Sequence, residues 1–164
     1  MVTISEAHLE MHFKEIQRLA SSIWKAHYTP IIGEEQVLYM LDKFQSAKAI
    51  ESQIKGGFKY YILSFENLPV GYLAIKKEED SLFLSKIYVL DKYRGQKIGK
   101  KAMAFITEKA YHYKLSKIRL TVNVNNINAI LAYKKMGFLN NGPLVTDIGN
   151  GYIMDDYEMI KQIN

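Results

Sequence analysis

The sequence of 164 residues contains no cysteine, which excludes disulfide bonds, thiolate metal sites and a cysteine nucleophile. No apolar run approaches the roughly 20 residues that a membrane-spanning helix needs, so no membrane partner is expected. The first residues, MVTISEAHLEMHF, lack the continuous apolar stretch of a secretory signal peptide. Hydrophobic residues make up 48% of the chain, too large a fraction for a disordered protein. These absences predict a cytoplasmic globular protein, and the length suits a single domain over residues 1–164.

Charge of one sign is scarce in two parts of the chain. Residues 92–119 hold nine Lys or Arg against Glu108 alone, a net charge of +8 in a chain whose total is +5. Residues 136–160 contain no Lys or Arg, and four acidic residues there give −4. This placement predicts an anionic ligand at the basic segment and a cationic one near the acidic tail; an ordinary solvated surface is the alternative. The basic residues have little aromatic interleaving, so nucleic acid is not the expected partner.

The pattern of apolar residues predicts an α/β (α+β) fold. It begins with a strand and several helices, continues with a meander of three strands, and ends with helix, strand, helix and two strands. The sequence His27-Tyr28-Thr29-Pro30 is expected to end the first helix, because a proline disfavours helix at the residue before it. Expected helices cover 9–24, a segment from residue 33 or 34, 46–57, 98–113 and 127–136, and expected strands cover 58–65, 70–76, 81–90, 117–123, 138–147 and 151–160.

The sharpest motif is the loop YRGQKIGK at residues 93–100, between an expected strand and an expected helix. Gly95 and Gly99 allow the backbone to approach a ligand closely, and the amide groups that open a helix have no partner within it. Arg94, Lys97 and Lys100 add positive charge. The loop predicts an anion site, and a simple chain reversal is the alternative. It matches neither the Walker loop nor the dinucleotide fingerprint.

Two segments resemble the GNAT family of N-acetyltransferases. Residues 87–102 (IYVLDKYRGQKIGKKA) resemble its acetyl-CoA-binding segment, and residues 123–138 (NVNNINAILAYKKMGF) resemble its Asn-x-x-Ala-x-x-x-Tyr-x-x-x-Gly-Phe block. The order of expected elements also matches the family. The resemblance implies the GNAT acyltransferase fold, with a central, mostly antiparallel mixed sheet of six to seven strands flanked by four to five helices. It also implies that acetyl-CoA is the cofactor.

The resemblance assigns the cofactor contacts. A strand with a bulge is expected to splay from its neighbour and to direct an N–H group at the thioester oxygen; core packing is the alternative for Ile87 and Val89. Lys97 stands where the family has its first glycine, and a lysine is tolerated there if its φ is negative and its side chain points to solvent or phosphate. The implied contacts are Ile87, Tyr88, Val89, Arg94, Gly95, Gln96, Lys97, Ile98, Gly99, Lys100, Asn123, Asn128 and Tyr133.

Tyr133 is the expected catalytic residue. The matching tyrosine of the family protonates the departing thiolate, and a phenol with a pKa of about 10 is protonated at neutral pH. Packing beneath the sheet is the alternative. The general base is open, because Ser85 occupies the position at which many relatives carry a glutamate. The base is either a chain of water molecules or a side chain from elsewhere, and the candidate side chains are Glu34, Glu35, Asp147, Asp155, Asp156 and His27.

The acceptor site is expected between the first helices and the last strand pair. Trp24, Tyr28, Asp155 and Asp156 are the candidate contacts, suited to a small amine. The segment at residues 24–30 is loosely similar to the spermidine-acetyltransferase-like branch of the family, which suggests a polyamine. The expected reaction is direct attack of the amine on the thioester, without a metal. A catalytically weak acyl-CoA-binding module and a protein or peptide N-acetyltransferase are the alternatives, and a homodimer is the candidate assembly.

Overall fold

The structure is a computed structural model that describes residues 1–163, and within them seven strands form one sheet. The strand order is β1-β2-β3-β4-β5-β7-β6, and every neighbouring pair is antiparallel except β4 and β5. This arrangement confirms the mostly antiparallel mixed sheet. The strands are β1 (Val2–Glu6), β2 (Phe58–Phe65), β3 (Leu68–Lys77), β4 (Ser81–Val89), β5 (Lys117–Asn123), β6 (Leu139–Gly149) and β7 (Tyr152–Gln162).

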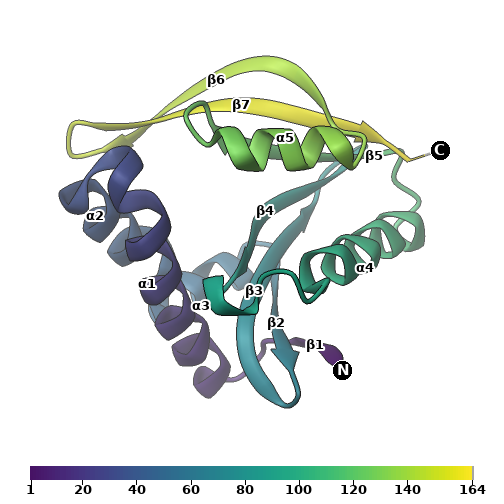
Figure 1. The fold of residues 1–164 in the computed structure, drawn as a ribbon, viewed down its shortest axis with the longest axis horizontal. Coiled ribbons are helices and arrows are strands. Elements are labelled where there is room, and N and C mark those ends of the chain that lie inside the picture. Colours follow the sequence, from purple (N-terminus) through teal and green to yellow (C-terminus); the bar gives the residue numbers. More distant parts are fainter. Residues whose placement is uncertain (164) are drawn as a thin grey trace.

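The helices cover both faces of the sheet (Figure 1). One face packs against the first three helices, with buried side chains such as Ile16, Val37 and Ile50. The other face packs against the last two, with Ile106 and Ile130. The five helices expected from the sequence are confirmed. They are α1 (Glu10–Ile32), α2 (Glu34–Gln45), α3 (Ala47–Lys55), α4 (Ile98–His112) and α5 (Ile127–Lys135), and a 3₁₀ turn, η1 (Asp91–Tyr93), precedes α4.

Local signals explain most element ends. The Ser46 hydroxyl accepts a hydrogen bond from the Ala49 amide at 3.1 Å and caps α3. Gly137 follows α5 with φ +99°, the left-handed geometry that ends helices. A two-residue turn, in which Glu66 and Asn67 both have positive φ, joins β2 to β3. Strand β3 therefore begins at Leu68, two residues earlier than expected.

The expected end of the first helix at residues 27–30 is wrong, because α1 continues to Ile32 through Pro30. A proline costs a helix one hydrogen bond and crowds the preceding turn. Here Pro30 lies in the last turn, and the chain before it is fixed from outside: the Tyr28 hydroxyl is hydrogen-bonded to that of Tyr88 on β4 at 2.8 Å. Tertiary contacts therefore override the local preference.

The feature that positions the site is the divergence of β4 from β5. These parallel strands pair only from Ser81↔Lys117 to Leu84↔Leu120. Beyond that point β4 continues to Val89 and β5 to Asn123, but the two strands are no longer hydrogen-bonded to each other. Figure 1 shows β4 leaving the direction of β5, with α4 and α5 on either side of the opening.

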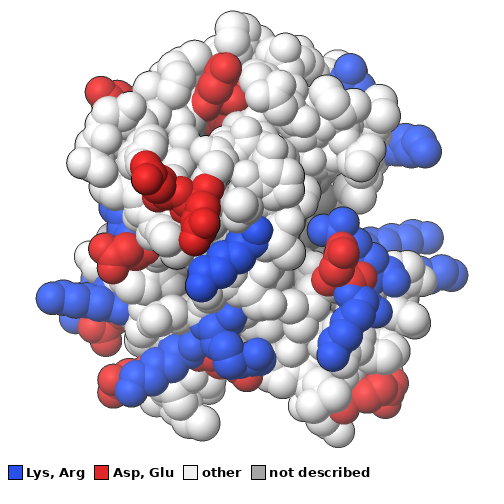
Figure 2. Space-filling model, turned by 60° about the vertical axis from the view of Figure 1, so that its left-hand side comes forward, with Lys and Arg blue, Asp and Glu red and all other residues white. Residues whose placement is uncertain are grey.

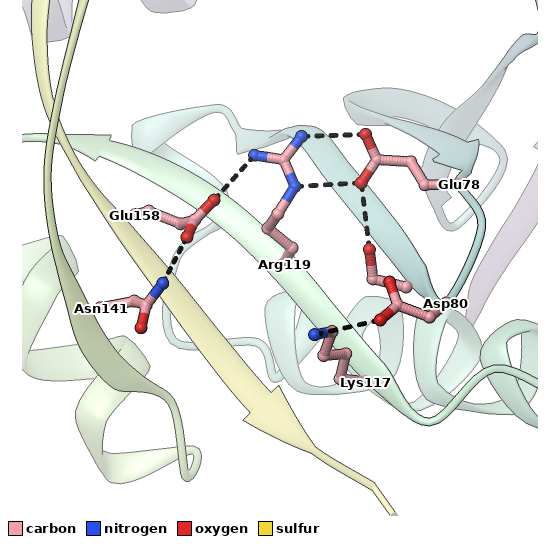
Figure 3. Close-up of polar contacts among 7 residues, drawn as sticks. Glu78, Asp80, Lys117, Arg119, Asn141 and Glu158 are labelled. Carbon is pink, nitrogen blue, oxygen red and sulfur yellow. Dashed lines mark hydrogen bonds and ion pairs between the residues drawn. The ribbon is translucent and has the colours of Figure 1, made fainter.

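A charged network holds the paired end of this opening (Figure 3). The Arg119 guanidinium on β5 donates to both carboxylate oxygens of Glu78 at 3.0 Å, and to Glu158 on β7 at 3.3 Å. Its charged group also lies 4.2 Å from the centre of the Phe83 ring. Lys117 forms an ion pair with Asp80 at 3.3 Å. The network joins the β3–β4 turn to β5 and β7 at the end where β4 and β5 are still paired.

The β6–β7 hairpin packs against α2. Its turn at residues 149–151 confirms the expected hairpin. The Gln36 amide donates to the Ile153 carbonyl at 2.8 Å, and the Tyr39 hydroxyl donates to the Ile148 carbonyl at 2.7 Å. These bonds hold the hairpin and the start of β7 beside α2, in the region where the sequence predicted the acceptor site.

Candidate active site

A cavity of about 750 Å³ occupies the opening between β4 and β5. Its walls come from α1, α2, β4, the loop before α4, β5, α5 and β7. Most of the residues expected to contact cofactor or acceptor line it, but Gln96, Lys100 and Asp155 do not. The lining residues among those expected are Trp24, Tyr28, Ile87, Tyr88, Val89, Arg94, Gly95, Lys97, Ile98, Gly99, Asn123, Asn128, Tyr133 and Asp156.

The loop before α4 has the geometry of an anion site. No side chain caps the start of α4, so its first amide groups have no partner from the helix or from a capping residue. A Cβ atom built at Gly95 or Gly99 would meet nothing within 4 Å, so the backbone borders open space there. Arg94 and Lys97 add positive charge at the same rim. A pyrophosphate group fits these features.

The condition of a negative φ, under which the sequence suggested that a lysine is tolerated at this position, is not met by Lys97. Its φ is +62° and its ψ is +19°, the left-handed conformation that a residue with a Cβ adopts at a cost of about 1 kcal/mol. The chain has to turn from η1 into α4 within a few residues, and Lys97 is the N-cap of that helix. The position thus keeps the backbone geometry that a glycine would adopt freely.

Strand β4 carries a bulge, as expected, but at Ser85 rather than beside Ile87 and Val89. Ala74 of β3 is paired with Lys86, and Ile75 is paired with Leu84, so Ser85 has no partner in the ladder. From there to the end of β4, the edge that faces β5 has no strand partner. Backbone groups along this edge can pair with an extended ligand, as a sheet edge does with an added strand.

The side chains of this segment face both layers. Ile87 and Val89 pack on the core beneath α4, and Tyr88 packs on the opposite core beneath α1. Core packing, the alternative considered for Ile87 and Val89, therefore holds, and both residues also line the cavity. Trp24 lies edge-on to Tyr28 and Tyr88, at centroid distances of 5.5 and 5.7 Å. Burial raises the pKa of Tyr28 to about 12, so this hydroxyl pair is neutral.

Tyr133 projects from α5 into the same cavity. Its ring lies 5.7 Å from that of Phe138, and the hydroxyl has no hydrogen-bond partner among residues 1–163. Burial raises the pKa of Tyr133 well above its usual value of 10. The hydroxyl is thus a protonated, unengaged donor at neutral pH.

Asp156 is the one carboxylate of the candidate bases that borders the cavity. It is 6% exposed on β7, with its Cα opposite that of Asn123. Burial raises its pKa to about 6, and the charge of Asp155 adds to the shift. It is therefore largely ionised at pH 7. Asp155, its neighbour on an alternating strand, is exposed instead, and Glu34, Glu35 and Asp147 are exposed and away from the cavity.

His27 borders the cavity between Tyr28 and the loop. Its Nε2 lies 3.1 Å from the Asn126 side-chain nitrogen. Burial, with a contribution from the charge of Arg94, lowers the pKa of His27, so its imidazole is neutral at pH 7. Asn123 uses its side-chain oxygen to accept from the Asn125 amide at 2.9 Å, which is the strand-capping role considered for it.

Several lining residues were not expected from the sequence. Lys86 follows the bulge on β4, and Asn126 precedes α5. Residues of α2 and β7 supply an apolar wall that includes Met40, Phe44 and Met154. Lys86 had a visible signal, because it is a lone charge in the otherwise uncharged strand LFLSKIYV. The apolar wall had none, since it depends on where the hairpin folds.

The described residues hold no group of three or more His, Cys, Asp or Glu arranged to bind a metal ion. None of the helices in residues 1–163 is long and apolar enough to span a membrane.

Figure 2 shows acidic side chains interspersed among the lysines and arginines on the face that it draws. Positive charge on that face is therefore not a continuous band of the kind that tracks a nucleic-acid backbone.

Comparison with known proteins agrees with this geometry. The family model "Acetyltransferase (GNAT) family" matches residues 16–138. A spermine/spermidine N(1)-acetyltransferase of Bacillus subtilis is 38% identical over 64 residues, which span 38% of this chain and 42% of that protein. The match thus covers less than half the length of this curated relative.

Solved structures show the same fold at low identity. The PaiA N-acetyltransferase of Thermoplasma acidophilum, solved in complex with coenzyme A, superposes with a TM-score of 0.81 at 19% identity, covering 99% of both chains. The ribosomal-protein-S18-alanine N-acetyltransferase of Escherichia coli gives 0.74 at 16% identity, covering 100% of this chain and 95% of that one. Because the family model matches most of the sequence, and the splayed strands and loop have the geometry that the family's signatures imply, the chain belongs to the GNAT acetyltransferase family.

Proposed function

We propose that this protein transfers an acetyl group from acetyl-CoA to the primary amine of a small molecule by direct attack of the amine on the thioester. The observation that carries the proposal is the divergence of β4 from β5, which opens a cavity between an anion-binding loop and two groups able to move protons. The absence of cysteine is consistent with a reaction that needs no cysteine acyl-enzyme.

The residues present fit the donor. The amides at the start of α4, with Arg94 and Lys97, suit the pyrophosphate, and the unpaired edge of β4 suits the pantetheine. When bound, acetyl-CoA supplies an activated acetyl group. The bulge at Ser85 interrupts the β3–β4 ladder at the point where β4 leaves β5, and an N–H group on this unpaired edge can stabilise the oxygen of the thioester as negative charge develops on it.

Two side chains handle the protons. Asp156, ionised at neutral pH, attracts the acceptor's ammonium group and takes the proton that the amine must lose before attack. Tyr133, held protonated by its burial, gives a proton to the sulfur that leaves as the carbon–sulfur bond breaks. The neutral Tyr28 and Tyr88 line the same cavity and do not exchange protons near pH 7.

The proposed acceptor is a small amine. The relatives named for spermine and spermidine make polyamines one class to test. The buried Asp156 favours an amine over a hydroxyl acceptor, because an ammonium group offsets the cost of burying the carboxylate.

A thiol-release assay tests the proposal. The full chain is mixed with acetyl-CoA and a panel of amines, amino acids, aminoglycosides and peptides, and free coenzyme A is followed with a thiol reagent. We expect release above the hydrolysis background with at least one small amine. Tight binding of coenzyme A in calorimetry without release on any acceptor would instead support the acyl-CoA-binding module, and release with peptides alone would support a peptide acetyltransferase.

A further inference from the structure

The acceptor side of the cavity is mostly apolar. The lobe that faces α1, α2 and the start of β7 is lined by Trp24, Ile32, Met40, Phe44, Ile153 and Met154. Such a surface suits an aliphatic or aromatic group. It offers a chain of several ammonium groups little beyond Asp156, since that residue is the only carboxylate lining the cavity in residues 1–163.

One cation lies in this apolar lobe, away from the anion-binding loop. Lys86 is directly opposite Ala74 in the β3–β4 ladder, and residues opposite each other point to the same face. Ala74 packs in the core beneath α1, α2 and α3, so Lys86 projects to the acceptor side of the sheet. Its amine donates to the Ser85 hydroxyl at 2.7 Å. Within the described residues it forms no ion pair with a carboxylate.

A desolvated ammonium without a counter-charge is unfavourable, and an anion that binds beside it relieves that cost. Burial lowers the pKa of Lys86 to about 8, which leaves the amine mostly protonated at pH 7. Its hydrogen bond to Ser85 occupies one of three donors. The remaining donors suit a carboxylate, whereas a second ammonium group of an acceptor would be repelled.

Lys86 and Asp156 lie on opposite sides of the opening. Lys86 is on β4, and Asp156 is on β7 with its Cα opposite Asn123 of β5. Because β4 and β5 separate beyond Leu84, an acceptor between them meets a cation on one side and an anion on the other. The lobe thus combines a carboxylate for an ammonium group, an amine for an anionic group, and an apolar wall.

We propose that the acceptor carries a carboxylate as well as its amine, with Lys86 as the residue that binds this carboxylate, and that the acceptor class is the apolar amino acids. This inference rests on the proposed acetyl transfer and specifies its substrate. Lys86 acts on specificity: it selects acceptors by charge and takes no part in moving protons or the acetyl group.

The test compares acceptors that differ in one charge. Thiol release is measured at pH 7 with phenylalanine, with phenylalaninamide, which keeps the ring and the amine, and with spermidine. We expect kcat/KM for phenylalanine to exceed that for the amide by about tenfold or more, as a charge-assisted hydrogen bond implies. Lys86→Met should reduce this ratio to about one, and Lys86→Arg, which keeps the charge, should retain most of it.

The outcomes separate this inference from the proposed function. Equal rates with acid and amide, a preference for spermidine, or an unchanged ratio in Lys86→Met would overturn the role of Lys86 while acetyl transfer stands. If no amine releases thiol, the proposed acetyl transfer is wrong. Calorimetry of phenylalanine binding to the coenzyme A-bound protein then tests whether Lys86 binds a carboxylate. Binding that is lost in Lys86→Met and kept in Lys86→Arg supports the site, and no binding overturns it. The coenzyme A affinity of each variant confirms that it is folded.

Discussion

The hydroxyl oxygens of Tyr28 and Tyr88 lie 2.8 Å apart and join the C-terminal half of α1 to β4 beside the opening in the sheet. Trp24 packs edge-on against both rings, and the ring centroid of Tyr72 lies 5.6 Å from that of Tyr88. This contact explains why α1 runs through Pro30, and it fixes one wall of the cavity against the strand that carries the bulge.

Tyr28→Phe should therefore destabilise the fold. The change removes one hydrogen bond and leaves the partly buried Tyr88 hydroxyl without its partner, a loss of about 1 kcal/mol. For a chain of this size that corresponds to a fall in Tm of about 2–4 °C in a thermal melt. Tyr152→Phe is the control, because that ring packs on Tyr39 and its hydroxyl makes no hydrogen bond within residues 1–163. An equal fall in both variants would contradict the assigned contact.

Tyr133→Phe should lower turnover without weakening the binding of coenzyme A. A positioned general acid contributes about 10²- to 10⁴-fold, so kcat should fall within that range. Removing one hydroxyl leaves the ring packed on Phe138 and should leave the Kd for coenzyme A nearly unchanged. Thiol release and calorimetry provide the two measurements. Unchanged kcat would remove Tyr133 from the acid role, and a large rise in Kd would make it a binding residue instead.

Lys97→Gly should stabilise the protein. Lys97 adopts φ +62°, and a glycine adopts that conformation without the cost of about 1 kcal/mol that a Cβ imposes. Part of the gain is offset because glycine increases the freedom of the unfolded chain. We expect a rise of up to about 1 kcal/mol in the free energy of unfolding, measured with urea. Lys97→Ala is the control: it removes the charge but keeps the Cβ, and should give no such gain.

The sequence predicts the parts of this molecule that depend on local signals. The loop at residues 93–100, the capping Ser46 and the turn after α5 are where expected, because each is encoded by a few adjacent residues. Which of Asp155 and Asp156 faces the cavity depends on the register of β7 against β5, which the spacing of the chain does not reveal. The same holds for Lys86, whose direction follows from a bulge one residue away. The left-handed conformation of Lys97 was missed because lysine rarely adopts it.

Asp156→Asn should remove a pH dependence of activity. With a pKa raised to about 6, the carboxylate is protonated below that pH and neither attracts an ammonium group nor accepts its proton. We expect kcat/KM for an amine acceptor to rise with pH through about 6 in the wild type, and this rise to be absent in Asp156→Asn. Asp155→Asn is the matched control: that side chain is exposed and outside the cavity, so the rise should persist, moved to a slightly lower pH because the charge of Asp155 contributes to the raised pKa of Asp156. If kcat/KM still rises with pH through about 6 in Asp156→Asn, this pH dependence belongs to another group.

The same substitution should make the fold more stable at pH 7. The pKa of Asp156 is higher in the folded protein than its ordinary 3.8, so the folded state binds this proton more tightly than the unfolded chain. The free energy of unfolding therefore falls as the pH rises from about 4 to about 6, and stays lower above that. Asp156→Asn cannot ionise and should have a higher Tm than the wild type at pH 7, with a smaller difference at pH 4. A lower Tm at pH 7 would mean that the carboxylate is paired in the folded state.

Arg119→Met should loosen the paired end of β4 and β5. Arg119 is mostly buried between Glu78 and Glu158, so its removal leaves two partly buried carboxylates without their cation. Ion pairs of intermediate burial fall between the surface and the buried cases, and we expect a loss of about 2 kcal/mol in urea unfolding. Lys117→Met is the control, since Asp80 in that pair is exposed and the loss should stay below about 1 kcal/mol. Because β4 and β5 separate directly beyond this network, Arg119→Met should also weaken the binding of coenzyme A, whereas Lys117→Met should not. Equal effects of the two variants on coenzyme A binding would show that the network does not determine where the strands separate.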